Sequence, residues 1–285
     1  MYRGKANSQK IHLLRLVLYW EYMSPLLEIK QLAVTDIQRY SAAVELEDGE
    51  TTTIHVVRYP IHAVNPRVIC FDQATRLADW CDDNNQPEAM VGGFFLRSAG
   101  KLLGDVWVNG VQQPSEPIAA PFGEKRAALS IEGQKLSIGP REALVTQPSG
   151  DILQAGPLLS QGGIAMVHNG DDPEGLTAAA YQFDSDISNG RYPRAAIGYN
   201  DTHIFSVVCD GYRDCALGAK DAGLTLEELA DAMITLGATE SLNLDGGGSS
   251  TQISGGMLRN HSRGDGREYP RGREVWTAIV FEPTT

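Results

Sequence analysis

The sequence predicts an α+β fold, in which a β-rich core of mixed or antiparallel sheet carries a few packed helices. Two observations support this prediction. Short apolar runs alternate with turn signals such as Asp48-Gly49 and Asn109-Gly110, pairs that are typical of tight β-hairpins. The segment from Thr225 to Leu236 instead combines helix caps with an apolar stripe at helical spacing. With 285 residues, 42% hydrophobic and 21% charged, the chain can bury a sizeable core.

The expected strands follow from the apolar runs between these turns. Three hairpins are expected: two around Asp48-Gly49 and Glu132-Gly133-Gln134, and one where the strand at 106–108 leads into Asn109-Gly110. The predicted strands are 43–46, 52–57, 67–70, 106–108, 129–131, 135–138, 203–209, 242–244 and 274–281.

Two helices are expected. The first spans 71–83, where Leu77, Ala78 and Trp80 supply apolar positions. The second spans 225–236, where Thr225 and Glu228 form a capping box and Gly237 ends the helix. Its apolar stripe is predicted to pack in the core.

The second helix joins the strand at 203–209 to the strand at 242–244, which predicts a rigid βαβ-like frame. Each of these strands is followed directly by a carboxylate, Asp210 and Asp245 respectively. We therefore expect the two carboxylates to be neighbours at the strand ends.

The most informative segment is Asn243-Leu244-Asp245 followed by Gly246, Gly247, Gly248, Ser249 and Ser250. Glycines at a strand end allow positive φ and close approach of a ligand. Successive N–H groups in such a turn can form an anion-binding concavity, with serine hydroxyls as further donors. A flexible Gly/Ser linker is the alternative, but ordered-looking segments on both sides favour a site. The segment has neither the Lys of a phosphate-binding P-loop nor the Gly-x-Ser-x-Gly spacing of a nucleophile elbow.

Net charge and the distribution of apolar residues limit the classes of partner and the cellular location that we expect. The net charge of −12 disfavours nucleic acid or an anionic membrane, because phosphate neutralisation needs a basic surface. No apolar run reaches the ~18 residues of a membrane span, and the apolar stretch 11–20 lacks a cleavage site. We therefore expect a cytoplasmic protein, with export left open if the start is mis-assigned, and treat 1–27 as a disordered extension before one domain over 28–285. The four cysteines are expected to be buried thiols, with a Cys209–Cys215 bridge open if the protein is exported.

Five motifs resemble those of the phosphodiester glycosidase family, over residues 65–285. They are the glycine-rich segment 243–251, Val91-Gly92-Gly93-Phe94-Phe95, Ala155-Gly156-Pro157, Pro193-Arg194-Ala195-Ala196-Ile197-Gly198, and Asp210-Gly211-Tyr212-Arg213. Val91 stands where the family usually has Asn, Ala195 replaces Thr, and Tyr212 precedes Arg213.

The resemblance implies hydrolysis of a sugar-1-phosphodiester at the glycosidic C–O bond, which releases a free sugar and a phosphomonoester. The leaving phosphate is already a weak base, so this chemistry needs cationic or N–H stabilisation of the phosphate and a carboxylate at the anomeric centre. We assign Asp245 to that carboxylate and Asp210 to its partner, and we expect Asn243 to orient one of them. Substrate or phosphate binding is assigned to Arg194, Arg213, Gly246, Gly247, Gly248, Ser249, Ser250, Gly92 and Gly93. Arg273, before the last predicted strand, could also face the site, but surface ion pairing is the favoured interpretation.

Two other functions stay open. A binding protein could hold a sugar phosphate or nucleotide in the same pocket without turnover, and a phosphodiesterase could cut the P–O bond. No cofactor is expected, because the six histidines show no metal-ligand spacing. Acidic residues at 171–172 and 184–186 leave a Ca²⁺ or Mg²⁺ ion as a secondary alternative. The expected partner is a small-molecule or glycan phosphodiester, and the oligomeric state is left undetermined.

Overall fold

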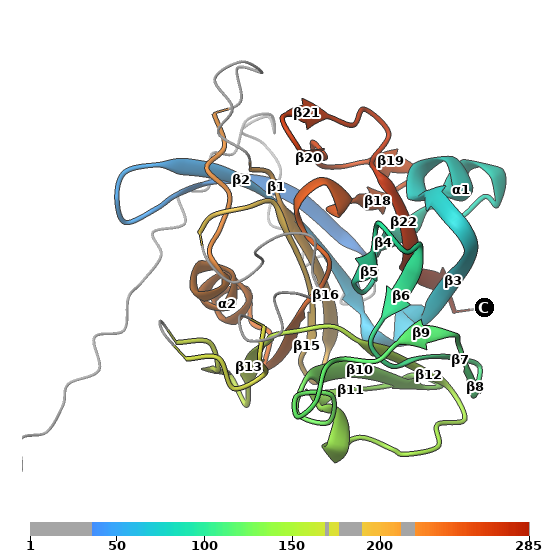
Figure 1. The fold of residues 1–285 in the computed structure, drawn as a ribbon. Helices are drawn as coiled ribbons and strands as arrows, with labels where there is room; N and C mark the ends of the chain where they lie inside the picture. Colours follow the sequence, from blue (N-terminus) through green and yellow to red (C-terminus); the bar gives the residue numbers. More distant parts are fainter. Residues whose placement is uncertain (1–35, 169–170, 177–189, 212–219, 285) are drawn as a thin grey trace, which may run out of the picture.

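A computed structural model describes residues 36–168, 171–176, 190–211 and 220–284 of the chain. Its largest element is a seven-stranded antiparallel sheet, seen near the centre of Figure 1. In spatial order its strands are β1 (Gln38–Glu45), β2 (Thr51–Pro60), β16 (His203–Cys209), β15 (Arg194–Tyr199), β17 (Glu240–Asn243), β13 (Leu158–Gln161) and β14 (Ile164–Ala165).

Two five-stranded sheets complete most of the architecture. One contains β19 (Met257–Leu258), β18 (Gln252–Ser254), β4 (Glu88–Val91), β22 (Glu274–Pro283) and β3 (Val64–Arg76). The other contains β11 (Lys135–Pro140), β10 (Ala127–Glu132), β12 (Asp151–Gln154), β7 (Val106–Val108) and β8 (Val111–Gln112).

The remaining regular elements are short. They are the sheet of β5 (Phe95–Leu96), β6 (Lys101–Leu103) and β9 (Ser115–Glu116), the hairpin of β20 (Arg263–Gly264) and β21 (Arg267–Glu268), and the helices α1 (Leu77–Asp83) and α2 (Leu226–Thr235). The β-rich core is therefore confirmed, but the described residues contain only these two α-helices, so the fold is mostly β.

The inner strands of the seven-stranded sheet are buried on both faces. Along β2, Ile54 and Val56 point into an apolar cluster shared with α2, whereas Val57 and Tyr59 point into the larger cluster shared with β4 and β22. This alternation follows from the two-residue period of a strand. A strand covered on both faces reads as an almost continuous apolar run, as this one does.

Local signals in the sequence locate most elements well. The three predicted hairpins form, with β1 paired to β2, β7 to β8 and β10 to β11. Helix α2 begins with the predicted capping box, in which the Thr225 hydroxyl accepts the Glu228 N–H and the Glu228 carboxylate accepts the Thr225 N–H.

The predicted helix at 71–83 is wrong over its first half. Residues 71–76 continue β3, with Thr75 opposite Val275 and Arg76 opposite Glu274 of β22. Only Leu77–Asp83 is helical. Pairing with a strand some 200 residues later in the chain overrides the local helical pattern, and tertiary context commonly does so.

The expectation that Asp210 and Asp245 are direct neighbours is also wrong. Strands β16 and β17, which precede these residues, are parallel to each other, but β15 lies between them and pairs with both. The segment that carries Arg194 therefore occupies the central position in the predicted frame.

Candidate active site

Three segments meet where the inner strands β15, β16 and β17 of the seven-stranded sheet begin or end, at one end of these strands. Arg194, the first residue of β15, lies opposite Cys209, the last residue of β16. On the other side of β15 the Leu244 N–H donates to the Ala195 carbonyl at 2.9 Å. Asp210, Arg194 and Asp245 therefore lie at this end of the strands. The two carboxylate-bearing residues are two strand spacings apart, about 10 Å.

The backbone of Asp245 is fixed by the residue that follows β4. Its N–H donates to the Gly92 carbonyl at 3.0 Å. In the side chain, Oδ1 accepts the Gly246 N–H at 2.9 Å, whereas Oδ2 is buried and has no hydrogen-bond partner among the described residues. A buried carboxylate oxygen without a partner is energetically costly and is therefore expected mainly where a ligand completes the site.

Burial raises the pKa of Asp245, because the surrounding protein disfavours the charged form. The Arg273 guanidinium, the Ser249 hydroxyl, the Gly246 N–H and Arg97 act in the opposite direction. Asp245 thus lies in a weakly solvated place whose nearby charges are cationic, an environment typical of functional carboxylates.

The glycine-rich turn does not form the predicted open row of N–H donors. The Gly246 N–H binds Asp245, the Gly247 N–H binds the Pro193 carbonyl, and the Ser249 and Ser250 N–H groups close a 3-10 turn onto Gly246 and Gly247. Within the described residues, the N–H of Gly248 alone in this run makes no hydrogen bond. Glycine at position 247 is instead required by the backbone of the turn, because a φ of +58° favours glycine.

The two serines of this turn are buried and differ in their contacts. The Ser249 hydroxyl accepts a hydrogen bond from Arg273, whereas Ser250 Oγ has no partner among the described residues. The Ser262 hydroxyl hydrogen-bonds to the Gly248 and Ser250 carbonyls and so stabilises the turn.

Arg273 is a site residue, which sequence analysis considered only as the second interpretation. Its Nη2 donates to Ser249 Oγ, its Nη1 lies 3.6 Å from Asp265 Oδ2, and its Nε is buried without a partner among the described residues. Phe95 supports the guanidinium at 5.9 Å from the ring centroid. The expected ion pair is present, with Asp265, but the guanidinium also contacts the glycine-rich turn, because the segment before β22 folds back over that turn.

Arg194 lies at the predicted strand end, but its side chain is held on the side of α2. It is 3% exposed, and its Nε and Nη2 donate to the Leu224 and Gly190 carbonyls at 3.1 Å each. The guanidinium also lies 5.4 Å from the Tyr192 ring centroid. These contacts make Arg194 a residue that connects β15 to the start of α2.

Asp210 is almost fully buried, and both carboxylate oxygens have partners. Oδ2 lies 3.0 Å from His55 Nε2 and Oδ1 accepts the His261 N–H at 2.7 Å. On the other side of the ring, His55 Nδ1 lies 2.8 Å from Ser41 Oγ. Sequence analysis missed His55, because its contact with Asp210 depends on the pairing of β2 with β16.

The other predicted residues have packing roles in the described structure. Asn243 Nδ2 donates to the Gly156 carbonyl at 2.9 Å, while its Oδ1 is buried without a partner among the described residues. The N–H groups of Gly92 and Gly93 bind the carbonyl and hydroxyl of Thr277. Arg213, Cys215 and the acidic residues at 184–186 lie outside the described residues, and the part described contains three free cysteines and no cluster of three metal-ligating side chains.

The family model for phosphodiester glycosidases matches residues 84–282, which include the whole of this site apart from His55 and Ser41. The chain belongs to the phosphodiester glycosidase family. No curated protein matches it.

Solved structures share the fold at low sequence identity. The zebrafish N-acetylglucosamine-1-phosphodiester alpha-N-acetylglucosaminidase catalytic domain, auto-inhibited by its pro-peptide, matches with a TM-score of 0.65 and 15% identity, over 87% of this chain and 83% of that one. A hypothetical protein from Synechocystis has a TM-score of 0.64 and 17% identity, over 86% and 62% of the two chains.

A third structure, named "Putative exported protein" and from Burkholderia pseudomallei, has a TM-score of 0.57 and 15% identity, over 82% of this chain and 75% of that one. That description gives the cytoplasmic expectation no support. In the described part of the chain, no helix is long and apolar enough to span a membrane.

Proposed function

We propose that this protein hydrolyses the glycosidic C–O bond of a sugar-1-phosphodiester, giving a free sugar and a phosphomonoester. The observation that carries the proposal is Oδ2 of Asp245, which is buried and has no hydrogen-bond partner among the described residues, on a carboxylate that is stabilised by the charge of Arg273. A carboxylate next to a cation suits a substrate that develops positive charge at the anomeric carbon and negative charge on the leaving phosphate.

In this mechanism Arg273 and the N–H of Gly248 stabilise the leaving phosphate. A guanidinium pairs with phosphate oxygens through two parallel hydrogen bonds, and a phosphomonoester needs little protonation to leave. Asp245 stabilises the cationic sugar or accepts a proton from the attacking water. The water oxygen bonds to the anomeric carbon, the bond from that carbon to the phosphate oxygen breaks, and the proton ends on the phosphate or in solvent.

Asp210 and Arg194 act as positioning residues in this account. Both carboxylate oxygens of Asp210 already bind His55 and His261, and the Arg194 guanidinium already binds two carbonyls. They fix the ends of β16 and β15 beside Asp245. The proposed reaction uses substrate and water, without a cofactor, a nucleic-acid partner or a membrane.

A panel of sugar-1-phosphodiesters tests the proposal. Wild type is expected to release free sugar from at least one member, and Asp245→Asn to reduce kcat by about 10³-fold or more, since a group acting directly in the chemistry is removed. Asp201→Asn is the matched control, because Asp201 is exposed in a turn. Similar turnover of Asp245→Asn and wild type would contradict the assignment.

The same panel distinguishes this hydrolase from a binding protein. The binding protein is the alternative function because Val91 stands where the family usually has Asn. Saturable binding of a sugar-1-phosphodiester with no product from any member would favour the binding protein.

A further inference from the structure

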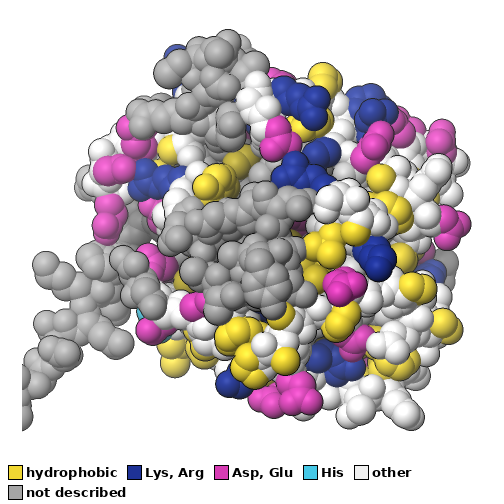
Figure 2. Space-filling view, in the orientation of Figure 1, with side chains coloured by type: hydrophobic (Ala, Val, Ile, Leu, Met, Phe, Trp, Pro, Cys, Tyr) yellow, Lys and Arg dark blue, Asp and Glu magenta, His cyan; other side chains and the backbone are white. Residues whose placement is uncertain are grey.

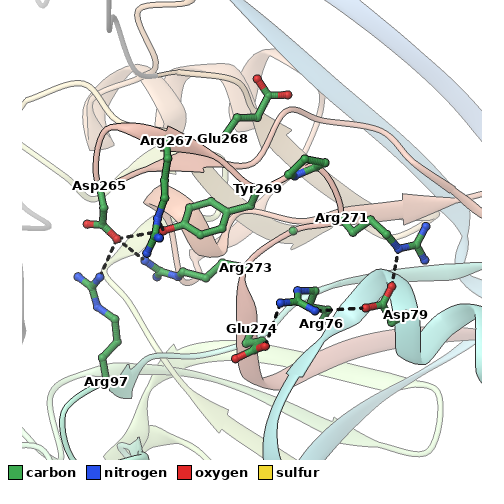
Figure 3. A pocket seen from close by; sticks show the side chains of 12 residues that line it. Arg76, Asp79, Arg97, Asp265, Arg267, Glu268, Tyr269, Arg271, Arg273 and Glu274 are labelled. Atoms are coloured by element: carbon green, nitrogen blue, oxygen red, sulfur yellow. Dashed lines mark hydrogen bonds and ion pairs between the residues drawn. The ribbon is translucent and has the colours of Figure 1, made fainter. Parts of the chain in front are cut away.

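A second feature of the molecule is a mixed-charge pocket beside the glycine-rich turn, with a volume of about 630 Å³. Its charged side chains form two groups (Figure 3). In one group, Arg76 and Arg271 are paired with the carboxylates of Asp79, Asp82 and Glu274, so this group presents no positive excess to an anion. Figure 2 shows basic and acidic side chains interspersed over the upper part of this face, where Figure 1 places β20, β21 and α1.

The second group is built around Asp265. Its Oδ2 lies 2.9 Å from Arg97 Nη1, 3.6 Å from Arg273 Nη1 and 3.2 Å from the Tyr269 hydroxyl, and Figure 3 shows these contacts converging on one carboxylate. Arg267 belongs to the same group, because its Nε donates to the Tyr269 hydroxyl at 3.0 Å and its charge interacts with Asp265. Asp265 thus contacts the arginine that we assign to the leaving phosphate.

The hairpin of β20 and β21 holds Asp265 in this place. Asp265 and Gly266 form the two-residue turn between the paired residues Gly264 and Arg267, with φ values of +54° and +71°. Positive φ at both positions is typical of a type I′ turn, in which Asn is as suitable as Asp at the first position. A Cβ on Gly264 would lie 2.7 Å from Gly248 N, so the hairpin packs directly on the glycine-rich turn. The turn itself therefore does not require the negative charge of Asp265.

Asp265 offsets positive charge at the proposed phosphate site. Arg273 and Arg97 are the cations that lower the pKa of Asp245, and both contact Asp265. An anion bound to the Arg273 guanidinium would lie close to Asp265, because that guanidinium is 3.6 Å from Asp265 Oδ2. Coulomb repulsion scales with the charge of the ligand, so a dianion is disfavoured about twice as much, in free energy, as a monoanion.

We propose that Asp265 is a specificity residue for ligand charge, which weakens binding of the dianionic phosphomonoester product more than binding of the monoanionic phosphodiester substrate and so favours product release. The inference rests on the proposed function, because it takes Arg273 as the residue that binds the leaving phosphate. A phosphodiester carries a single negative charge, whereas a phosphomonoester carries nearly two above its second pKa of about 6. Hydrolysis therefore increases the negative charge beside Asp265.

The test uses two anions that lack a sugar and differ in charge: phenyl phosphate, which is a dianion at about pH 8, and its monoanionic methyl ester. Calorimetry measures their affinities for wild type and Asp265→Asn at low ionic strength, where screening by salt is weak. Asp265 is 45% exposed, so its charge acts largely through water. Two charges about 6 Å apart in water interact by an energy worth about threefold in affinity. Asp265→Asn is therefore expected to bind the methyl ester about 3-fold and phenyl phosphate about 10-fold more tightly than wild type.

Asp201→Asn is the matched control. Asp201 is exposed in the turn between β15 and β16, at the opposite end of these strands from Arg194, and its replacement removes the same charge from the molecule. Neither affinity is expected to change in this variant. Thermal unfolding of both variants checks folding.

Three results for Asp265→Asn would overturn the inference: unchanged affinities, equal tightening of both anions, and weaker binding of both. The last would show that Asp265 holds Arg97 and Arg273 in position for the anion. If a sugar-1-phosphodiester is hydrolysed, its phosphomonoester product is expected to inhibit Asp265→Asn more strongly than wild type, and equal inhibition would contradict the inference.

Failure of the proposed function would look different. If no sugar-1-phosphodiester is hydrolysed, the two anions still test the charge effect, because neither is a substrate. The expected difference between them in Asp265→Asn would then support the effect in a protein that binds phosphate esters without turnover. Binding of neither anion to wild type or to Asp265→Asn would contradict the inference, since Arg273 would then form no anion site.

Discussion

Asp245 is the central residue of the proposed site. Its backbone is held by the carbonyl of Gly92, one carboxylate oxygen is bound by Gly246, and the other is buried without a partner among the described residues. Such a carboxylate lowers the stability of the native protein when it is ionised. That cost provides a test of its environment that does not depend on any substrate.

Asp245→Asn is expected to unfold at a higher temperature than wild type at pH 7. The native pKa of Asp245 is raised above its unfolded value of about 4, so the native state keeps the proton to higher pH and wild type loses stability as pH rises through that window. The neutral amide avoids this loss. Thermal unfolding of both proteins from pH 3 to 8 should show a gap that grows with pH, and a gap independent of pH would contradict a desolvated carboxylate.

The same shift predicts the pH dependence of turnover. If Asp245 acts in its ionised form, the acidic limb of kcat/KM should lie above the pH range of an ordinary aspartate. A profile of kcat/KM against pH measures this limb, and an acidic limb near pH 4 would contradict the raised pKa.

Arg273 should matter through its planar guanidinium as well as its charge. Arg273→Lys is expected to lower kcat/KM by about 10²-fold, because a lysine cannot pair with the phosphate while also binding Ser249. Steady-state kinetics on the best substrate of the panel measures the effect. A change of less than twofold would remove Arg273 from phosphate stabilisation.

At the scale of elements, the residue that follows β4 packs so closely on β22 that a side chain at Gly92 is excluded. A Cβ at Gly92 would lie 2.9 Å from the Thr277 carbonyl carbon of β22. Gly92→Ala is therefore expected to destabilise the protein by about 1–3 kcal/mol in denaturant unfolding, as overpacking does. Gly139→Ala, on β11 with open space around it, is the control and should change stability little.

An element is predictable from the sequence when the residues that determine its conformation are close together in the chain. Capping boxes and hairpin turns are local, so α2 and the hairpins were predictable from Thr225, Glu228 and the glycine pairs. Residues 71–76 were not, because their strand conformation depends on β22 at the other end of the chain.

At the scale of the whole molecule, the site joins segments that are far apart in sequence. Asp245 and the glycine-rich turn were identifiable, because their residues are consecutive. Arg97 and His55 were not, since Arg97 follows β5 and His55 lies in β2, both far from Asp245 in the sequence. Arg273 was considered, but its contact with the turn depends on the fold of the segment before β22. Arg194 shows the converse: its position at the strand end was predictable, but the direction of its guanidinium depends on Leu224 and Gly190.

The central claim is that water attacks the sugar carbon and not phosphorus. The most direct test uses a sugar-1-phosphodiester that the protein hydrolyses. The reaction is run in ¹⁸O-labelled water, and both products are analysed by mass spectrometry. The account predicts that the label enters the sugar hydroxyl and that the phosphomonoester contains none. Label in the phosphomonoester would show P–O cleavage and would contradict the assignment of Asp245 to the anomeric centre.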